Sequence, residues 1–361
     1  MVHIFSRLGV NIAFDSASGS VHVVDDVARD IVSCYGKTPR GEAVTAVAQK
    51  HGIPESEVEE CFDDVEELVR EGKLFSEDKF RPDITFVTSR PTVVKALCLH
   101  IAHTCNLDCD YCFASQGRYH GERALMSFEV GKRAIDFLIE NSGTRHNLEV
   151  DFFGGEPLMN FDVVKKITAY ARSLEQQSGK HFRFTLTTNG MLVDDDVIEF
   201  SNREMDNVVM SLDGRKEVND RFRHTVGGVG SFDIIVPKFQ KFAKARGEKD
   251  YYIRGTFTHL NPDFMADIDV MLDLGFDRLS MEPVVADPSS PYALTEDDKQ
   301  IVCREYEKLA ERLVERARAG RPFTFYHFML DLEHGPCVYK RISGCGSGTE
   351  YLAVTPTGEL Y

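Results

Sequence analysis

The chain has 361 residues, 42% of them hydrophobic, which is enough for two or three domains with real cores. Its 58 acidic and 42 basic residues give a formal net charge of −16, which argues against non-specific binding to nucleic acid. No apolar run approaches the length that spans a bilayer, and the N-terminus lacks a signal-peptide core. Nine cysteines, an odd number, do not suit a secreted disulfide framework, so we expect a protein of the reducing cytoplasm.

Residues 1–75 predict a small α+β domain of winged-helix-like shape. Apolar runs predict three strands, and helical spacing then predicts three helices, at residues 2–8, 11–14, 21–24, 26–35, 40–51 and from 54 onward. Such domains often bind DNA, but the third helix carries eight acidic residues between 55 and 67, which a phosphate backbone would repel. Cys34 and Cys61 fall on apolar stripes of these helices, so we expect both to be structural.

Residues 76–92 have the proline-containing, mixed composition of a linker, with one short strand expected at 84–88. Strand and helix patterns then alternate through residues 93–320, which predicts parallel strands joined by crossover helices. The expected strands lie at residues 97–101, 148–153, 182–187, 208–212, 251–257 and 278–284, and the expected helices at 128–140, 163–176, 195–202, 232–245 and 264–273. Six such units predict an α/β fold, a partial (β/α)6 barrel with its chemistry at the carboxyl ends of the strands.

Three thiols, of Cys105, Cys109 and Cys112, follow the first of these strands at the spacing C-x3-C-x2-C. Thiolates at such spacing can converge from one loop onto a single inorganic centre. Three ligands on a four-iron cluster leave one iron open to a small molecule. A zinc site is one alternative, with His100 or His103 as a further ligand, and buried structural cysteines are another.

Polar and glycine-rich segments follow the next three strands. Gly154, Gly155 and Glu156 come after the second strand, where glycines allow the backbone to approach a ligand closely and Glu156 offers a carboxylate to a ligand ammonium group. Asn189 follows the third strand and Ser211 ends the fourth. Each segment alone could be a plain turn, but their repetition at strand ends favours contact with a ligand.

The cysteine spacing, with Tyr111 before the third cysteine, resembles the signature of the radical S-adenosylmethionine (SAM) enzymes. The resemblance implies that Cys105, Cys109 and Cys112 hold a [4Fe-4S] cluster whose open iron binds SAM. Reduction of that cluster would cleave SAM to methionine and a 5′-deoxyadenosyl radical. The resemblance also implies cofactor contacts from Gly154, Gly155 and Glu156 to the SAM amino group, from Asn189 and Ser211 to its other polar groups, from Arg223 to its carboxylate and from Tyr111 to its adenine. Glu282, after the sixth strand, is either a further pocket residue or a solvated charge.

The N-terminal domain resembles the peptide-recognition domain that precedes many maturases of ribosomally made peptides. Residues 11–15 and 19–26 look like this domain in the maturases of six-cysteine "SCIFF" peptides. The resemblance implies that a leader peptide adds as a strand beside the third strand and rests on the third helix.

Residues 321–361 resemble the beginning of a SPASM extension, in which cysteines hold auxiliary iron–sulfur clusters. Cys345 and Gly358 match that pattern, and its next cysteine would fall beyond Tyr361, so we expect the segment to continue past the printed residues. Cys345 and Cys337 are candidate ligands of an auxiliary cluster, with a structural pair as the alternative. A turn at 354–358 predicts a hairpin. 

A long helix over residues 295–319 precedes this segment, with a start like a capping box. Cys303 in that helix and Cys98 in the first barrel strand are assigned structural roles.

Together these resemblances predict a radical SAM peptide maturase that forms thioether crosslinks within a cysteine-rich precursor peptide. Its expected partners are that precursor with its leader and a reductant protein such as flavodoxin or ferredoxin, with neither nucleic acid nor membrane. One alternative is another SPASM-type enzyme, such as a sulfatase maturase or a different peptide-modifying enzyme. The other is an iron–sulfur regulator of the winged-helix type.

Overall fold

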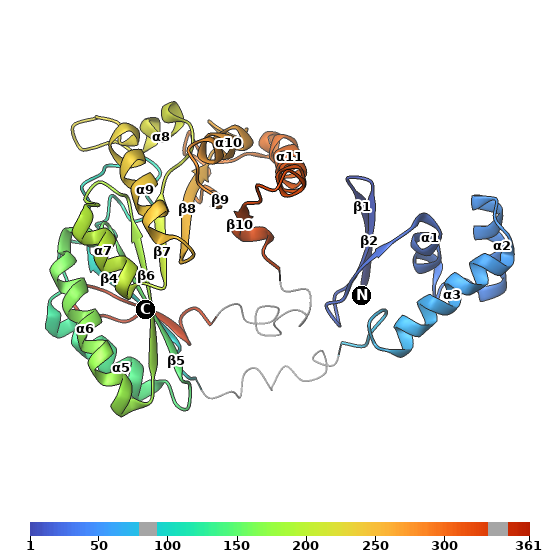
Figure 1. Ribbon diagram of the computed structural model, residues 1–361, viewed down its shortest axis with the longest axis horizontal. Coiled ribbons are helices and arrows are strands. Elements are labelled where there is room, and N and C mark those ends of the chain that lie inside the picture. The colour runs from blue at the N-terminus through green and yellow to red at the C-terminus, as the bar shows by residue number, and fades with distance from the viewer. Residues whose placement is uncertain (79–91, 331–345) are drawn as a thin grey trace. The chain divides into compact units, whose positions relative to one another are not determined.

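The structure is a computed structural model that describes residues 1–78, 92–330 and 346–361. Contacts divide the described residues into two compact units, residues 1–78 and residues 92–329 together with 346–361 (Figure 1). The strand expected at 84–88 lies outside the described residues, as do Cys337 and Cys345. None of the helices in the described ranges has the length and apolar character needed to cross a membrane.

The N-terminal unit is a three-stranded antiparallel sheet followed by three helices, which confirms the expected small α+β domain. Its elements are β1 (Val2–Arg7), β2 (Val10–Asp15), β3 (Val21–Val24), α1 (Asp26–Cys34), α2 (Arg40–His51) and α3 (Glu55–Arg70). Strand order is β1-β2-β3, so β3 is an edge strand that bonds only β2 among the described strands. Ala13 of β2 packs with Ile31 of α1 and Phe62 of α3 in a closed apolar core.

The second unit is built on an eight-stranded sheet in which every neighbouring pair of strands is parallel. The strands are β4 (Ala96–Ala102), β5 (Asn147–Gly154), β6 (His181–Thr188), β7 (Asn207–Ser211), β8 (Asp250–Phe257), β9 (Arg278–Pro283), β10 (Thr324–Phe325) and β11 (Tyr351–Val354). They lie in the order β10-β9-β8-β7-β6-β5-β4-β11. The six predicted barrel strands are β4 to β9, and the partial barrel is confirmed, with two further strands added at its edges.

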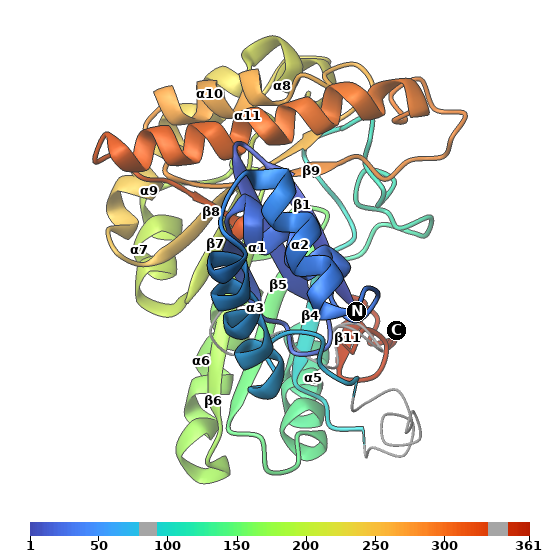
Figure 2. The same cartoon turned by 90° about the vertical axis from the view of Figure 1, so that its right-hand side faces the viewer.

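Helices cover the outer face of this curved sheet (Figure 1). They are α5 (Phe128–Asn141), α6 (Phe161–Ser178), α7 (Asp195–Glu204), α8 (Lys216–Phe222), α9 (Phe232–Arg246), α10 (Met265–Asp273) and α11 (Lys299–Arg318), with short 3-10 turns η1 (Pro157–Asn160), η2 (Glu296–Asp298) and η3 (Tyr326–Phe328). Helix α11 packs along α10 (Figure 2). The expected capping box is present, since Thr295 and Asp298 bond each other's backbone, but it opens η2 rather than α11 itself.

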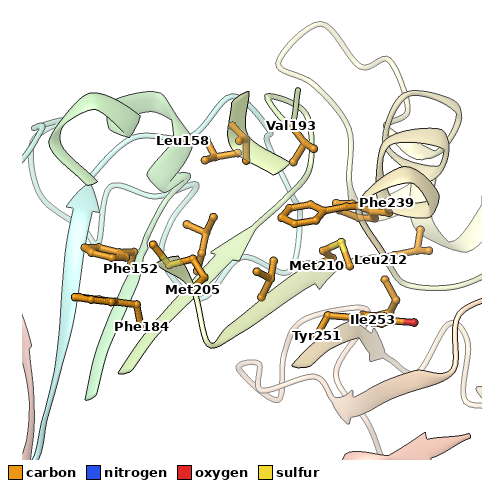
Figure 3. Packing of buried hydrophobic residues seen from close by; sticks show 14 of the residues in the cluster. Phe152, Leu158, Phe184, Val193, Met205, Met210, Leu212, Phe239, Tyr251 and Ile253 are labelled. Atoms are coloured by element: carbon orange, nitrogen blue, oxygen red, sulfur yellow. The ribbon is translucent and has the colours of Figure 1, made fainter. Parts of the chain in front are cut away.

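The core of this unit lies between the sheet and its helices. Alternation along β6 buries Phe182, Phe184 and Leu186 on the helix side and turns Thr187 to the other face. Phe184 stacks on Phe152 of β5, with ring centroids 5.6 Å apart and planes only 10° apart (Figure 3). The buried apolar face thus holds each strand in the core. The polar residues at the strand ends are not needed for this packing and can bind a ligand.

The described end of the chain forms the expected hairpin. After β11 the backbone turns at Gly358, whose φ is +93°, and Val354 pairs with Leu360 in antiparallel fashion. The same strand also adds to the barrel, because β11 pairs in parallel with β4 from Tyr351 to Val354. The sequence pattern did not predict this second pairing, which joins residues more than 250 positions apart.

Candidate functional site

A pocket in the second unit lies at the carboxyl ends of β4 to β7. All three clustered cysteines line it, together with residues that follow the neighbouring strands: Cys105, Cys109, Tyr111, Cys112, Gly154, Gly155, Thr187, Asn189, Ser211 and Arg223. Because the ends of parallel strands meet at one edge of a sheet, residues spread over more than 100 positions converge there. The structure thus brings together every residue in the predicted cofactor set except Glu156.

The cysteine loop is held by backbone hydrogen bonds rather than by regular structure. The Cys112 N–H donates to the Cys109 carbonyl at 3.2 Å, and the Leu107 N–H points at the Cys105 sulfur at 3.4 Å. The Asp108 N–H donates to the His224 carbonyl at 2.8 Å, which ties the loop to the segment after α8. These bonds fix where the three thiols point before any ligand is bound.

The three cysteines are partly buried. Burial raises the pKa of Cys105 to about 11 and that of Cys109 to about 12, even though the nearby Arg223 guanidinium lowers both. The free thiols of Cys105 and Cys109 are therefore protonated near neutral pH, and a cationic metal centre would favour their thiolate forms. Three such sulfurs in one pocket are the donor set of an iron–sulfur cluster with one iron left open.

The zinc alternative has no support in the geometry. Across the described ranges, no group of three or more His, Cys, Asp or Glu side chains is arranged to hold a single metal ion. His100 and His103 instead bond each other, with ring nitrogens 3.1 Å apart, and stack against Tyr119. They line a second pocket with Arg118 and Glu359, separate from the thiols.

Gly154 and Gly155 lie where two backbone segments nearly touch. A Cβ on Gly155 would lie 2.1 Å from the Thr104 carbonyl oxygen, and one on Gly154 would lie 2.5 Å from that of Ala102. Gly154 also has a φ of +122°, which L-residues rarely adopt. We expected these glycines to admit a ligand. In the structure, the absence of side chains at these two glycines lets the backbone at the start of the cysteine loop pack directly against the end of β5.

Glu156 departs from its expected task. Its side chain is fully buried and does not line the pocket. The carboxylate accepts hydrogen bonds from the Leu158 N–H at 3.0 Å, the Thr188 hydroxyl at 2.8 Å and the Asn189 N–H at 2.7 Å. With its oxygens engaged in this way, it joins the ends of β5 and β6 instead of facing a ligand ammonium group. The contact of Glu156 with the SAM amino group stays a prediction.

Burial raises the pKa of Glu156 to about 7, although its hydrogen bonds lower it. The folded state thus keeps a proton that the unfolded chain loses at a lower pH, and the stability that this proton contributes disappears as pH rises through about 7. We predict that wild-type protein loses stability relative to Glu156→Gln between about pH 4.5 and pH 7, by roughly 3 kcal/mol. Denaturation of both proteins across this range measures the difference, and parallel pH profiles would contradict the prediction.

Tyr111, Asn189 and Ser211 all reach the pocket. The Asn189 side-chain amide donates to the Cys105 sulfur at 3.4 Å and to the Asn106 side-chain oxygen at 2.8 Å. The Tyr111 hydroxyl turns away from the thiols and donates to the Asp213 carboxylate at 2.6 Å. Asn189 thus orients the first cysteine, while Tyr111 offers the pocket its ring rather than its hydroxyl.

Arg223 supplies the positive charge of the pocket. It ends α8 and is only 8% exposed. One terminal nitrogen, Nη1, donates to the Tyr111 hydroxyl at 3.0 Å, whereas its buried Nε has no hydrogen-bond partner among the described residues. A buried donor without a partner is costly, so an anionic group in the pocket would satisfy it. The three thiols therefore fit an iron–sulfur cluster, and the guanidinium beside them fits the carboxylate of SAM.

The sequence pattern did not predict the roles of Gln116, which lines the pocket, and of Asn106, which bonds a pocket residue. Gln116 donates from its side-chain amide to the Cys109 carbonyl at 3.3 Å, and Asn106 accepts from Asn189. Asn106 directly follows the first cysteine, which is the only sequence signal that could have found it. Gln116 carries no signal, because its role depends on the left-handed turn, with φ of +53°, that folds the loop back.

The remaining candidates lie elsewhere. Glu282 is half-buried at the end of β9, paired with Arg254 and 3.6 Å from His327, and it is not part of the three-thiol pocket. Cys98 is largely buried within β4, as expected of a structural cysteine. Cys303 is exposed on α11, so it does not contribute to the core.

Comparison with known proteins finds similarity in the part of the chain that forms the pocket. Residues 99–274 match the family model of the Radical SAM superfamily. The radical SAM cyclopropyl synthase TigE of Paramaledivibacter caminithermalis is 25% identical over 207 residues, which cover 50% of this chain and 42% of that protein. The solved structure of anSMEcpe with bound AdoMet and the Cp18Cys peptide has a TM-score of 0.60 at 20% identity, over 74% of this chain and 73% of that one.

A further solved structure matches across both units. Streptococcus suis SuiB bound to S-adenosylmethionine has a TM-score of 0.55 at 15% identity, over 99% of this chain and 80% of that one. At such identities the structures show a shared fold. The chain spans less than half the length of the first curated relatives that it matches, with 42%, 42% and 31% of their residues covered.

Proposed function

We propose that this chain belongs to a radical SAM enzyme that crosslinks a ribosomally made peptide, and the match of residues 99–274 to the model of the Radical SAM superfamily supports this proposal. The reaction joins a cysteine sulfur to a carbon of an acceptor residue, as an intramolecular thioether in a cysteine-rich precursor. The observation that carries the radical SAM assignment is the convergence of Cys105, Cys109, Cys112 and Arg223 on one pocket at the strand ends.

In this proposal the pocket residues bind and orient the cofactors. Cys105, Cys109 and Cys112 hold the cluster, and Arg223 meets the carboxylate of SAM. Asn189 and Ser211 contact its remaining polar groups, and the ring of Tyr111 lies near its adenine. When bound, a [4Fe-4S] cluster and SAM supply a 5′-deoxyadenosyl radical that takes one hydrogen atom from a peptide carbon.

The hydrogens and electrons that crosslinking removes from the peptide determine which further electron carrier the enzyme needs. The peptide loses one hydrogen from carbon and one from sulfur as the C–S bond forms. The carbon-bound hydrogen leaves as an atom, so closing the bond releases a proton and one electron. An electron acceptor must therefore lie near the substrate thiol. Cys337 and Cys345 remain the proposed ligands of an auxiliary cluster with that task, and both lie outside the described residues.

The N-terminal unit supports a peptide as the substrate. Its sheet ends in β3, an edge strand with Val21 and Val23 exposed, and such an edge can pair with an extended peptide. SuiB aligns with 99% of this chain, which includes this unit, and anSMEcpe was solved with a peptide bound. We therefore propose that β3 and α3 receive the leader of the precursor, and that flavodoxin or ferredoxin supplies the reducing electron.

Two alternative functions differ in how well the observations support them. The second candidate is another SPASM-type radical SAM enzyme, either a sulfatase maturase or a different peptide-modifying enzyme that closes another bond. The matches to a cyclopropyl synthase and to an anaerobic sulfatase-maturating enzyme support this candidate. A DNA-binding regulator is disfavoured by the exposed carboxylates of α3, which include Glu57, Glu60, Asp64 and Glu67.

The test is the mass of the product peptide. The protein, reconstituted anaerobically with iron and sulfide, is given SAM, dithionite and a cysteine-rich precursor peptide with its leader. We expect the peptide to lose two hydrogens for each crosslink, and one cysteine per crosslink to become resistant to alkylation. The same peptide without its leader serves as the control and should react poorly. Loss of two hydrogens with every thiol still alkylated would contradict the thioether and support the second candidate.

A further inference from the structure

Asp213 is a buried charge that the cofactor assignment leaves unused. It follows β7, is fully buried and does not line the three-thiol pocket. Its two carboxylate oxygens accept hydrogen bonds from the Tyr111 hydroxyl at 2.6 Å and from the Thr256 N–H at 3.1 Å. The second bond attaches Asp213 to the backbone of β8. That strand is held in place by its pairing with β7 and β9. The carboxylate is therefore a rigid acceptor aimed at Tyr111.

Tyr111 stands between two opposite charges. Its hydroxyl donates to Asp213 and accepts from Arg223 Nη1 at 3.0 Å. The direction is unambiguous, because an ionised carboxylate can only accept and a guanidinium can only donate. Asp213 and Arg223 form no direct ion pair in the described part of the chain, so the hydroxyl carries the connection between them. The Tyr111 ring also rests against Phe222, with centroids 5.3 Å apart.

Arg223 lines the three-thiol pocket. The chain around it is fixed, since its carbonyl accepts from the buried Ser231 hydroxyl at 2.7 Å. The Nη1 bond to Tyr111 then restrains the guanidinium, while the buried Nε stays without a partner among the described residues. Because the guanidinium is a rigid planar fork, a restraint at one nitrogen limits the directions of its other donors.

We propose that Asp213 is a positioning residue which, through the Tyr111 hydroxyl, aims the Arg223 guanidinium at an anionic group in the three-thiol pocket. The inference rests on the proposed function, because that anion is either the carboxylate of SAM or the negative charge of the thiolate-bound cluster. Asp213 touches neither. It acts by holding Tyr111, and Tyr111 acts by holding Arg223.

The experiment uses reconstituted full-chain protein and the Tyr111→Phe variant, which removes one hydroxyl and keeps the ring. Tyr251→Phe is the matched control. Tyr251 is buried and its hydroxyl also donates to a carboxylate, that of Asp277 at 2.6 Å, but neither residue lines the three-thiol pocket. Asp213→Asn provides an independent second variant. The readouts are iron content, the SAM dissociation constant and the midpoint potential of the cluster without SAM.

We expect Tyr111→Phe and Asp213→Asn to keep their iron and to bind SAM about tenfold more weakly, or Tyr111→Phe, which leaves every charge in place, to lower the midpoint potential, while Tyr251→Phe matches wild type. A change in SAM affinity that vanishes with decarboxylated SAM identifies the carboxylate as the anion. A shift in potential without SAM identifies the cluster charge. Variants that match wild type in both readouts, while Arg223→Lys does not, would overturn the inference alone. Wild-type protein that takes up neither iron nor SAM would refute the proposed function and the inference together.

Discussion

Replacing Cys109 with alanine is expected to abolish binding of the iron–sulfur cluster. Cys109 lines the pocket with Cys105 and Cys112, and its sulfur is buried where no other described thiol can take its place. Two sulfurs on one short loop hold a four-iron cluster poorly, because the open iron and the unligated iron are then both exposed to hydrolysis. Iron and sulfide content after anaerobic reconstitution should therefore fall to background.

Cys303→Ala is the matched control for this prediction. Cys303 is exposed on α11 and takes no part in the pocket, so the variant should take up as much iron as wild type. A Cys109→Ala protein that retains the iron and sulfide of wild type would show that the three thiols do not form the cluster site.

Gly155→Ala is expected to damage both the fold and the site. The added Cβ would lie 2.1 Å from the Thr104 carbonyl oxygen and 3.0 Å from the Cα of Gly117, so backbone has to move on two sides. These are the segments that begin and close the cysteine loop. Overlap with backbone cannot be relieved by a side-chain rotation, and we expect a loss of about 4 kcal/mol or more in unfolding free energy. Chemical denaturation measures this loss, and iron uptake should fall with it.

Gly179→Ala separates crowding from backbone strain. Gly179 ends α6 with a φ of +66°, and a Cβ there would meet no atom within 4 Å. Its substitution should cost about 1 kcal/mol through the left-handed conformation alone and leave iron uptake unchanged. Equal losses of stability in the two variants would mean that the close approach at Gly155 has no special weight.

Local patterns predicted most of the fold. The alternation of strands and helices located β4 to β9, since each strand buries one face against its own crossover helix. The cysteine loop was found for a similar reason, because its spacing lies within eight residues. In contrast, β10 has only two residues and β11 pairs with a strand at the far end of the sequence. Neither feature leaves a periodic signal, so both had to come from the structure.

The roles of individual side chains in the site were harder to predict than which residues form the site. Glu156 was expected to face a ligand, yet its environment is made by Thr188 and the Asn189 N–H on another strand. Asp213 was not singled out from the sequence, yet it is the acceptor at the end of a network that reaches Arg223. A sequence motif gives the neighbourhood of a side chain, whereas its hydrogen-bond partners depend on elements that only the fold brings near.

The most direct test of the central claim is the formation of 5′-deoxyadenosine. Reconstituted wild-type protein and Cys109→Ala are each incubated anaerobically with SAM and dithionite, and the nucleoside is quantified by mass spectrometry. We predict 5′-deoxyadenosine from wild type and none from the variant. Wild-type protein that holds its iron and binds SAM but forms no 5′-deoxyadenosine, even as the full-length protein with a peptide substrate, would contradict the claim that the three-thiol pocket is a radical SAM site.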